Sequence, residues 1–382
     1  TVLNIRRRHG AELMVKGKSM VSEEMGLNHF LEDQGLEVME TDLGEFIIQL
    51  AGEPPSHIIV PAVHKNKDQI AKIFHEMIPD TPYTEDVDEL TAIARAKLRQ
   101  KYFQGQVGLS GVNFAVAETG TLCLVENEGN GRMCTTVPPV HIAVMGLEKV
   151  VEKLEEVPPL LRLLTGSATG QLITTYFNMI TSPRRPGEKD GPHEVHLLIL
   201  DNGRSAMLND PELRQSLQCI RCGTCLNHCP VYVRIGGHAY GFVYPGPIGE
   251  VITPQLEGLG KAGELAGASS LCQACGEVCP VRIPLPDLIR RMRREGVGQG
   301  ADCCVRDFGT KRSTLESLAW KAWALLNTQP RLNALNNMLL GKLGDRLPQL
   351  GPLAAWTTGR TAPRFAPKSL HQLADEEGLH RD

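Results

Sequence analysis

The residues best suited to chemistry are seven cysteines that fall into two short runs. The first run has the pattern Cys-x-x-Cys-x-x-Cys-x-x-x-Cys-Pro and consists of Cys219, Cys222, Cys225, Cys229 and Pro230. The second run repeats this pattern without its first cysteine, whose place Ser269 takes, and consists of Cys272, Cys275, Cys279 and Pro280. Such spacing is typical of proteins with two 4Fe–4S clusters, in which the fourth cysteine of each run crosses to the other cluster.

The crossing rule divides the seven thiolates between two predicted clusters. The first cluster takes Cys219, Cys222, Cys225 and Cys279, and the second takes Cys229, Cys272 and Cys275. The second cluster then has an undecided fourth position. An oxygen or nitrogen donor could complete it, from Ser269, Ser270 or His228; alternatively, the cluster has lost one iron, or one iron is open to a small ligand. The pair Cys303 and Cys304 could also reach back to it.

Zinc is the competing metal for paired cysteines. Zinc sites use two Cys-x-x-Cys pairs without a trailing Cys-Pro, so the spacing favours iron–sulfur clusters. Between the runs, residues 236–249 are rich in glycine, proline and tyrosine. This segment is interpreted either as a set of turns or as a wrap that covers a cluster with backbone N–H groups and tunes its potential.

The composition excludes several classes of protein. The net charge of −4 gives no overall argument for binding nucleic acid or an anionic membrane. No run approaches the ~20 apolar residues of a membrane-spanning helix, and no apolar segment follows Arg6, Arg7 and Arg8, as an export signal requires. The first 122 residues contain no cysteine. Because disulfide scaffolds spread their cysteines over the chain, we expect metal binding in a reducing compartment.

Hydrophobic patterning predicts an α/β domain with a mostly parallel sheet over residues 1–205. The predicted strands are 45–50, 57–60, 114–117, 121–125, 141–145 and 195–200. The predicted helices are 65–78, 87–102 and one that Ser22 caps and Gly35 ends. A cluster domain follows over 206–300, with a helix at 285–294. Residues 301–382 form a helical extension with a helix at 313–326 and a loosely ordered tail from Gly341.

A second candidate site lies at turns beyond two predicted strands. Glu118 lies in the turn between these strands, and a Gly/Asn-rich segment with Asn127, Asn130 and Arg132 follows the second. Such turns offer backbone N–H groups to anions at the carboxyl ends of strands. Arg132 could clamp a carboxylate, and Glu118 and His141 could act as catalytic acid or base. The alternative is that these residues only build turns.

Long segments of the chain resemble the lactate utilization protein B family. They are LQCIRCGTCLNHCPV (217–231), GGHAYG, YPGPIG and SSLCQACGEVCPV, with KSMVSEE (18–24), ETDLGE (40–45), PPSHIIVPAVHKN (54–66), GVNFAVAETGT (111–121), NEGNGR (127–132), VHIAVMGLEK (140–149) and DNGR (201–204). The resemblance implies a LUD domain, similar to the sugar-phosphate isomerase and CoA-transferase class, followed by a ferredoxin-like two-cluster domain. It also implies a bacterial cytoplasmic protein that works with a cysteine-rich A-like subunit and a second, C-like LUD protein in oxidising L-lactate to pyruvate.

Two functions are consistent with the sequence. No Gly-x-Gly-x-x-Gly follows a strand, so a Rossmann flavin or nicotinamide site is not expected. Oxidation of a 2-hydroxy acid removes two electrons, whereas 4Fe–4S clusters carry one at a time, so the first interpretation is an electron-relay subunit. The second is that the LUD domain is itself an enzyme or binding module for a small carboxylate or acyl ligand, with accessory clusters.

Overall fold

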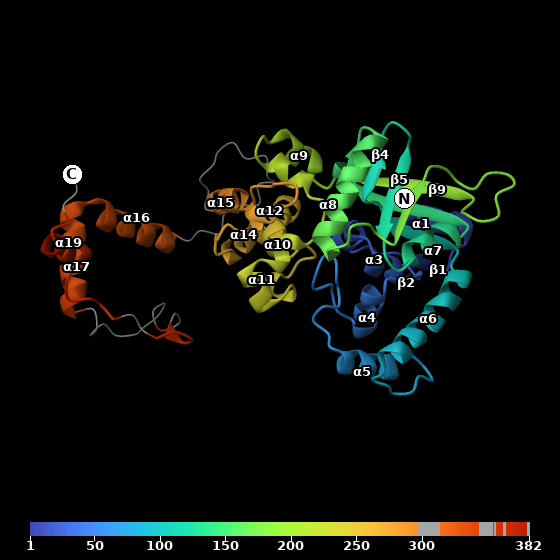
Figure 1. The fold of residues 1–382 in the computed structure, drawn as a ribbon, viewed down its shortest axis with the longest axis horizontal. Helices are drawn as coiled ribbons and strands as arrows, with labels where there is room; N and C mark the ends of the chain where they lie inside the picture. Colours follow the sequence, from blue (N-terminus) through green and yellow to red (C-terminus); the bar gives the residue numbers. More distant parts are fainter. Residues whose placement is uncertain (297–313, 344–353, 355–356, 362–363, 380–382) are drawn as a thin grey trace. The chain divides into compact units, whose positions relative to one another are not determined.

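The computed structural model describes residues 1–296, 314–343, 354, 357–361 and 364–379 (Figure 1). The chain divides into two compact units, Thr1–Thr310 and Lys311–Asp382. The expected boundary near residue 205 lies inside the first unit and remains a prediction. Cys303 and Cys304 lie outside the described residues. None of the described helices is long and apolar enough to cross a membrane.

The first unit is built on a five-stranded sheet in which all neighbouring strands are parallel. Its order is β2-β1-β3-β6-β9. The strands are β1 (Leu13–Lys16), β2 (Glu37–Glu40), β3 (Val107–Gly111), β6 (Val140–Gly146) and β9 (Glu194–Leu200). Successive side chains of a strand point to opposite faces, so Met14 packs into one apolar core and Val15 into another. Both faces of this sheet are therefore covered, as expected for parallel strands.

Seven helices cover the two faces of this sheet. They are α1 (Val2–His9), α2 (Met20–Glu24), α3 (Leu27–Asp33), α4 (Leu43–Ala51), α5 (Lys67–Met77), α6 (Val87–Gln104) and α7 (Asn130–Thr136). Residues of α1, α2 and α3 belong to the core that contains Met14, and residues of α4 to α7 belong to the core that contains Val15. In Figure 1, α4, α5 and α6 lie together along one side of the first unit.

A second, mixed sheet of four strands joins the first sheet to the cysteine region. Its order is β7-β4-β5-β8, with β5 antiparallel to both neighbours and β4 parallel to β7. The elements are β4 (Phe114–Val116), β5 (Thr121–Glu126), η1 (Leu147–Lys149), β7 (Val150–Val151), η2 (Leu154–Glu156), α8 (Val157–Thr169) and β8 (Tyr176–Ile180). Phe114 and Leu164 share an apolar core with Ile220 and Cys222, so the first cysteine run packs directly against this sheet and α8.

The cysteine region is a set of short helices around its own core. The elements are α9 (Arg204–Asn209), η3 (Leu213–Gln218), α10 (Thr224–Asn227), α11 (Pro230–Ile235), η4 (His238–Tyr240), α12 (Gly246–Glu257), α13 (Leu259–Ala262), η5 (Gly263–Ala268), α14 (Ala274–Glu277) and α15 (Leu285–Gly296). Ile58, from the α/β part, belongs to the same core as Cys229, Cys275 and Ile289. The two parts of the first unit therefore share buried apolar contacts.

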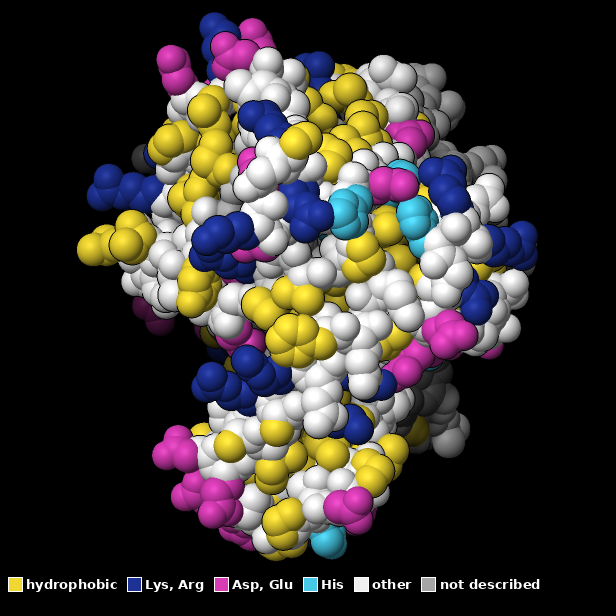
Figure 2. Space-filling model, turned by 90° about the vertical axis from the view of Figure 1, so that its right-hand side faces the viewer, with side chains coloured by type: hydrophobic (Ala, Val, Ile, Leu, Met, Phe, Trp, Pro, Cys, Tyr) yellow, Lys and Arg dark blue, Asp and Glu magenta, His cyan; other side chains and the backbone are white. Residues whose placement is uncertain are grey.

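The second unit contains three described helices, α16 (Thr314–Thr328), α17 (Pro330–Leu343) and α19 (Leu370–Glu376). A helix was expected at 313–326, and α16 confirms it over the described residues. The expected loose tail from Gly341 includes α19, whose start carries a capping box between Ser369 and Gln372. On the face of the first unit drawn in Figure 2, acidic and basic side chains are interspersed, in keeping with the small net charge.

The strands predicted at 114–117, 121–125, 141–145 and 195–200 are confirmed as β4, β5, β6 and β9, and the helices at 65–78 and 87–102 as α5 and α6. The strand predicted at 45–50 is wrong: this segment is helix α4, because the Asp42 side chain accepts the Glu45 N–H at 3.2 Å and caps it. The strand predicted at 57–60 is also wrong. His57 Nδ1 accepts the N–H groups of Ile59 and Val60, at 3.0 and 3.1 Å, which a strand would use in its ladder.

The predicted N-cap, Ser22, lies three residues after the residue that caps this helix in the structure. Ser19, not Ser22, caps the first of two short helices, and its Oγ accepts the Ser22 N–H at 3.3 Å. The mixed α/β architecture agrees with the expected class. The assignment to the sugar-phosphate isomerase and CoA-transferase class, and the ferredoxin-like character of the cysteine region, remain predictions.

Candidate functional site

The structure brings four cysteines of the two runs around one small cavity. Cys219, Cys222 and Cys225 come from the first run, and Cys279 comes from the end of the second. The rest of the wall is mainly apolar and includes Ile58, Ile220, Ile248, Val281, Ile283 and Leu285. These are the same four thiols that the crossing rule groups together.

The spacing of the thiols is too wide for a zinc site. Four thiolates around a tetrahedral zinc ion lie about 3.8 Å apart, because each Zn–S bond is about 2.3 Å long. Among the residues that the structure describes, no three cysteine sulfurs lie within 4.8 Å of one another. A cubane core places irons and sulfides between its ligands and holds them farther apart. The four thiols therefore fit a cubane cluster in number and type.

Burial disfavours the charged thiolate form of these cysteines when no metal ion balances its charge. Burial raises the pKa of Cys225 well above its usual value, and the nearby Cys219 and Cys222 raise it further, while a backbone hydrogen bond from Ile248 lowers it. The pKa of Cys222 is also raised, mainly by burial. Metal binding deprotonates thiols and offsets their mutual repulsion.

The remaining three motif cysteines lie near one another. Burial, together with the charges of Cys229, Glu250 and Cys272, raises the pKa of Cys275 to about 11. Cys229 and Cys275 are buried, whereas Cys272 is exposed. The structure thus places together the three cysteines that the crossing rule leaves for a second cluster.

The two runs follow similar backbone paths. Each begins after a 3-10 helix, η3 before Cys219 and η5 before Ser269. Cys219 Sγ accepts a backbone N–H two residues later at 3.4 Å, and Ser269 Oγ does the same at 3.1 Å. Ser269 therefore stands at the structural position of Cys219. His228 is exposed and its Nδ1 lies 3.0 Å from the Thr224 carbonyl oxygen, while Ser270 hydrogen-bonds the Cys272 thiol.

A larger cavity of about 430 Å³ lies in the α/β part of the first unit. Asp42, Glu126 and Glu128 line one part of it, and Lys18 lies near Asp42 and Glu128. Lys149 and Arg221 line another part. Three residues, Ile58, Ile220 and Arg221, line both this cavity and the one between the four cysteines. The two cavities are therefore separated by a wall one residue thick.

Arg221 and Lys149 carry the positive charge at this wall. The Lys149 Nζ donates to the Cys219 carbonyl at 3.3 Å, and burial lowers its pKa to about 8. Burial opposes the charge of Arg221, but Cys219, Tyr244 and Glu148 outweigh it and raise the Arg221 pKa. The buried Arg221 Nη1 has no hydrogen-bond partner among the described residues. Both side chains therefore place positive charge at this wall.

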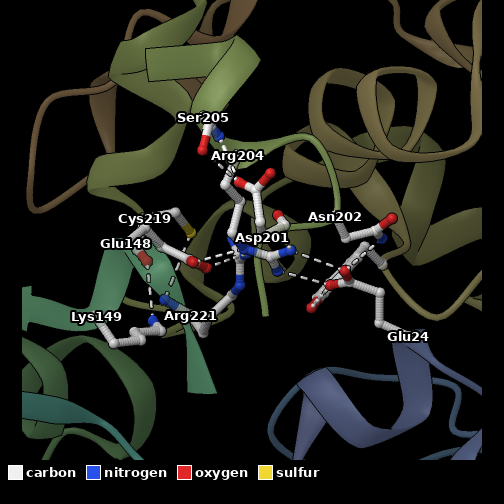
Figure 3. A network of polar contacts seen from close by, with 10 residues as sticks. Glu24, Glu148, Lys149, Asp201, Asn202, Arg204, Ser205, Cys219 and Arg221 are labelled. Carbon is white, nitrogen blue, oxygen red and sulfur yellow. Dashed lines mark hydrogen bonds and ion pairs between the residues drawn. The ribbon is translucent and has the colours of Figure 1, made fainter. Parts of the chain in front are cut away.

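A buried ion-pair network fixes the wall from the side of the α/β part (Figure 3). Arg204 donates to both oxygens of Glu24, at 2.9 and 2.7 Å, and its Nε donates to Glu148 at 2.6 Å. Arg221 donates to the other Glu148 oxygen at 3.3 Å and lies over the Tyr244 ring, whose hydroxyl donates to Glu24. The side chains of Arg204, Glu24 and Glu148 are each 2% exposed.

The carboxylates of this network stay charged despite their burial. Burial raises the pKa of Glu24, but the hydrogen bonds and charge of Arg204 outweigh it and leave the pKa below its usual value. The pKa of Glu148 is also lowered, because Arg221, Lys149 and Arg204 outweigh its burial. Charged partners on both sides are what make such a network stable in the interior.

The residues predicted for the second site are only partly brought together. Asn127 and Asn130 line the large cavity, but Arg132 does not: it is exposed, with its guanidinium over the Tyr176 ring at 5.9 Å. The backbone N–H groups of this turn are already used, since Glu126 accepts those of Gly131 and Arg132 at 2.6 and 2.7 Å. These two N–H groups are therefore not free to bind an anion.

The two predicted catalytic residues also lie away from the cavity wall. Glu118 is exposed and accepts the Leu154 N–H at 3.4 Å. His141 is fully buried on β6, where burial lowers its pKa to about 4 and its Nε2 lies 2.8 Å from the hydroxyl of Ser110. Only Ser110 of this pair lines the cavity.

No sequence motif identifies the main polar residues of the site. Lys18, Glu24, Lys149 and Arg204 occur in segments that carry the family resemblance, but no spacing rule marks them. Arg221 occupies a variable position inside Cys-x-x-Cys. Its φ of 61° is rare for a residue other than glycine, and this can be seen only in the folded backbone.

Comparisons with known proteins cover nearly the whole chain. Residues 4–200 match the LUD domain, residues 215–283 match a 4Fe–4S dicluster domain and residues 291–379 match the C-terminal domain of lactate utilisation protein B. The domain matched at 215–283 contains all seven motif cysteines. The region therefore is an iron–sulfur domain.

Curated relatives match over almost the same extent. An uncharacterized electron transport protein of Escherichia coli, YkgF, is 45% identical over 95% of this chain and 75% of its own. Lactate utilization protein B of Bacillus licheniformis is 45% identical over 94% of this chain and 74% of its own, and that of Bacillus subtilis is 44% identical over the same shares. A solved DUF162 family protein from Deinococcus radiodurans covers 26% of this chain and 56% of its own at 19% identity, with a TM-score of 0.20, too low to inform the fold.

Replacing Arg204 by alanine should destabilise the protein by about 3–5 kcal/mol, because two buried carboxylates lose their main cation. Anaerobic thermal unfolding of the iron-loaded protein measures the change. The matched control is Arg290→Ala, which removes an exposed pair with Asp287 and should cost at most about 1 kcal/mol. Equal shifts for the two variants would show that the network does not hold the fold.

Replacing Cys279 by alanine should damage the cluster that is otherwise held by Cys219, Cys222 and Cys225, more than fifty positions earlier in the chain. The reason is that Cys279 lies at their cavity and not with its own neighbours Cys272 and Cys275. EPR and iron analysis of the anaerobic variant would identify the affected cluster, with Cys229→Ala as the reciprocal variant. If both variants lose the same cluster, the prediction that the last cysteine of each run binds the cluster of the other run is wrong.

Proposed function

We propose that this chain, which belongs to the lactate utilization protein B family, is the iron–sulfur electron-transfer subunit of a complex that oxidises L-lactate to pyruvate. It would hold two 4Fe–4S clusters and work in the cytoplasm with a cysteine-rich A-like subunit and a second, C-like LUD protein. The names of its curated relatives, which include an electron transport protein and several lactate utilization proteins, support this proposal.

The observation that carries the proposal is the shared wall between the two cavities. A ligand in the 430 Å³ cavity is separated from the four thiols only by Ile58, Ile220 and Arg221. Iron–sulfur clusters transfer single electrons. Because the wall is one residue thick, an electron donor in the cavity lies close to the first cysteine set.

The residues of the wall can bind and orient a small carboxylate. Arg221 has an unused buried N–H donor, and the Lys149 ammonium has donors beyond its contact with Cys219. Charge-assisted hydrogen bonds to both would hold a carboxylate beside the wall. The mainly apolar lining of the cavity near Ile59, Val112 and Leu164 would exclude water from the rest of a small acid.

The cavity also favours a second candidate, in which the LUD domain itself acts on the small carboxylate and the clusters are accessory. In that case the isolated chain would oxidise the ligand without partner subunits. The first candidate requires a partner to begin the two-electron oxidation, because a cluster accepts one electron at a time.

L-lactate should reduce the clusters of the purified anaerobic chain only after the partner subunits are added. The loss of visible absorbance and the EPR signals of reduced clusters measure this, with D-lactate as the control. Reduction by L-lactate in the chain alone would establish the second candidate instead. Clusters that stay oxidised with every combination of subunits would contradict both.

Replacing Lys149 by methionine should weaken the binding of lactate or pyruvate at least about tenfold, since a hydrogen bond to a charged group contributes about 1.5–3 kcal/mol. Calorimetric titration of the iron-loaded protein measures the affinity. Arg132→Ala is the matched control, because Arg132 does not line the cavity and its loss should leave the affinity unchanged. Weakening by Arg132→Ala alone would place the ligand at the Gly/Asn-rich turn.

A further inference from the structure

Glu250 is a buried carboxylate whose charge is not balanced by a hydrogen-bond partner. Its side chain, on α12, has a relative exposure of 0%, and neither oxygen has a partner among the described residues. Among the described residues, no other carboxylate has both oxygens completely buried and without a hydrogen-bond partner. Burying an unpaired carboxylate costs several kcal/mol. Glu24 and Glu148 avoid this cost through Arg204.

The position of Glu250 gives this carboxylate a specific set of neighbours. Its charge acts on the thiol of Cys275, together with the charges of Cys229 and Cys272. The Tyr240 hydroxyl, which is also buried without a partner among the described residues, is affected by the charges of Glu250, Cys229 and Tyr232 and of Cys225 from the first set. Two oxygen groups without partners therefore lie near the cysteines, and Glu250 is the one whose charge acts on Cys275.

Helix α12 borders the first set of cysteines. Ile248, near the start of the helix, lines the first cavity, and its backbone hydrogen-bonds Cys225. Two residues along an α-helix correspond to a rotation of about 200°. The Glu250 side chain therefore leaves the helix on the side opposite to Ile248, and its charge acts on Cys275 of the second set.

We propose that the Glu250 carboxylate is the fourth protein ligand of the second cluster, which is then held by Cys229, Cys272, Cys275 and Glu250. This inference rests on the iron–sulfur chemistry of the proposed function. Binding releases any proton on the carboxyl group to solvent, and the iron supplies the positive charge that the buried carboxylate needs. No electron is transferred in this step.

Arg293 does not fill this role. Its guanidinium is the cation that acts on Glu250, but it donates to the carbonyl oxygens of Ala266, at 2.6 Å, and of Ser269. Ser269 stands at the position of Cys219, but a carboxyl group loses its proton to become an anionic ligand far more readily than a serine hydroxyl does. Ser269→Ala is therefore the matched comparison for Glu250.

The test compares Glu250→Gln, a near-isosteric variant, with Ser269→Ala in anaerobically prepared full-length protein. The parent should hold about eight irons, one of which has the larger Mössbauer isomer shift of an iron with an oxygen ligand. Glu250→Gln should remove that component, lower the iron content by about one, and give the EPR signal of an oxidised three-iron cluster. Ser269→Ala should keep the parent spectrum, and the first cluster serves as an internal control in both.

Three outcomes would overturn the assignment. One is an unchanged Mössbauer spectrum in Glu250→Gln, and another is loss of the oxygen-ligated iron in Ser269→Ala. The third is the same loss in a Cys303→Ser, Cys304→Ser double variant. A parent protein with only about four irons would instead contradict the two-cluster part of the proposed function. If the Glu250→Gln variant loses the whole second cluster, the Ser269→Ala spectrum decides between the two residues. The oxygen-ligated iron remains in that spectrum if Glu250 is the ligand and disappears if Ser269 is the ligand.

Discussion

Arg204 is the cation on which the arrangement of the first unit depends. It pairs with Glu24 from α2 and with Glu148 beyond β6, and all three side chains are almost completely buried. Removing any one of them would leave an uncompensated charge in a medium of low dielectric constant. Because Glu148 also binds Arg221 and Glu24 also binds Tyr244, the same network holds the first cysteine run against the α/β part.

This network explains why the two cavities share a wall. Arg221 lies between two motif cysteines and has a left-handed backbone conformation. Its side chain stacks on Tyr244 and reaches Glu148, so the loop that presents Cys219 and Cys222 is fixed relative to Lys149 and the larger cavity. The iron–sulfur region and the ligand cavity therefore form one site, although about seventy residues separate Lys149 from Cys219 along the chain.

The errors of the sequence analysis have a common cause. The segment 45–50 is apolar enough for a strand, but the Asp42 cap starts a helix there. The turn at 127–132 has the glycines of an anion site, but the Glu126 carboxylate occupies its N–H groups. In both cases one side chain satisfies backbone groups nearby, and this competition between local hydrogen bonds is decided by geometry and not by hydrophobic pattern.

The sequence by itself determined the seven cysteines, the missing eighth position and several strands and helices, because ligand spacing and hydrophobic periodicity are local properties of the chain. The tertiary structure decided which thiols meet, since Cys279 joins residues more than fifty positions away. It also decided that Arg221 and Lys149 face a cavity and that Glu250 lies unpaired beside Cys275. Burial and charge balance arise only when distant segments pack together, so no spacing rule could have revealed them.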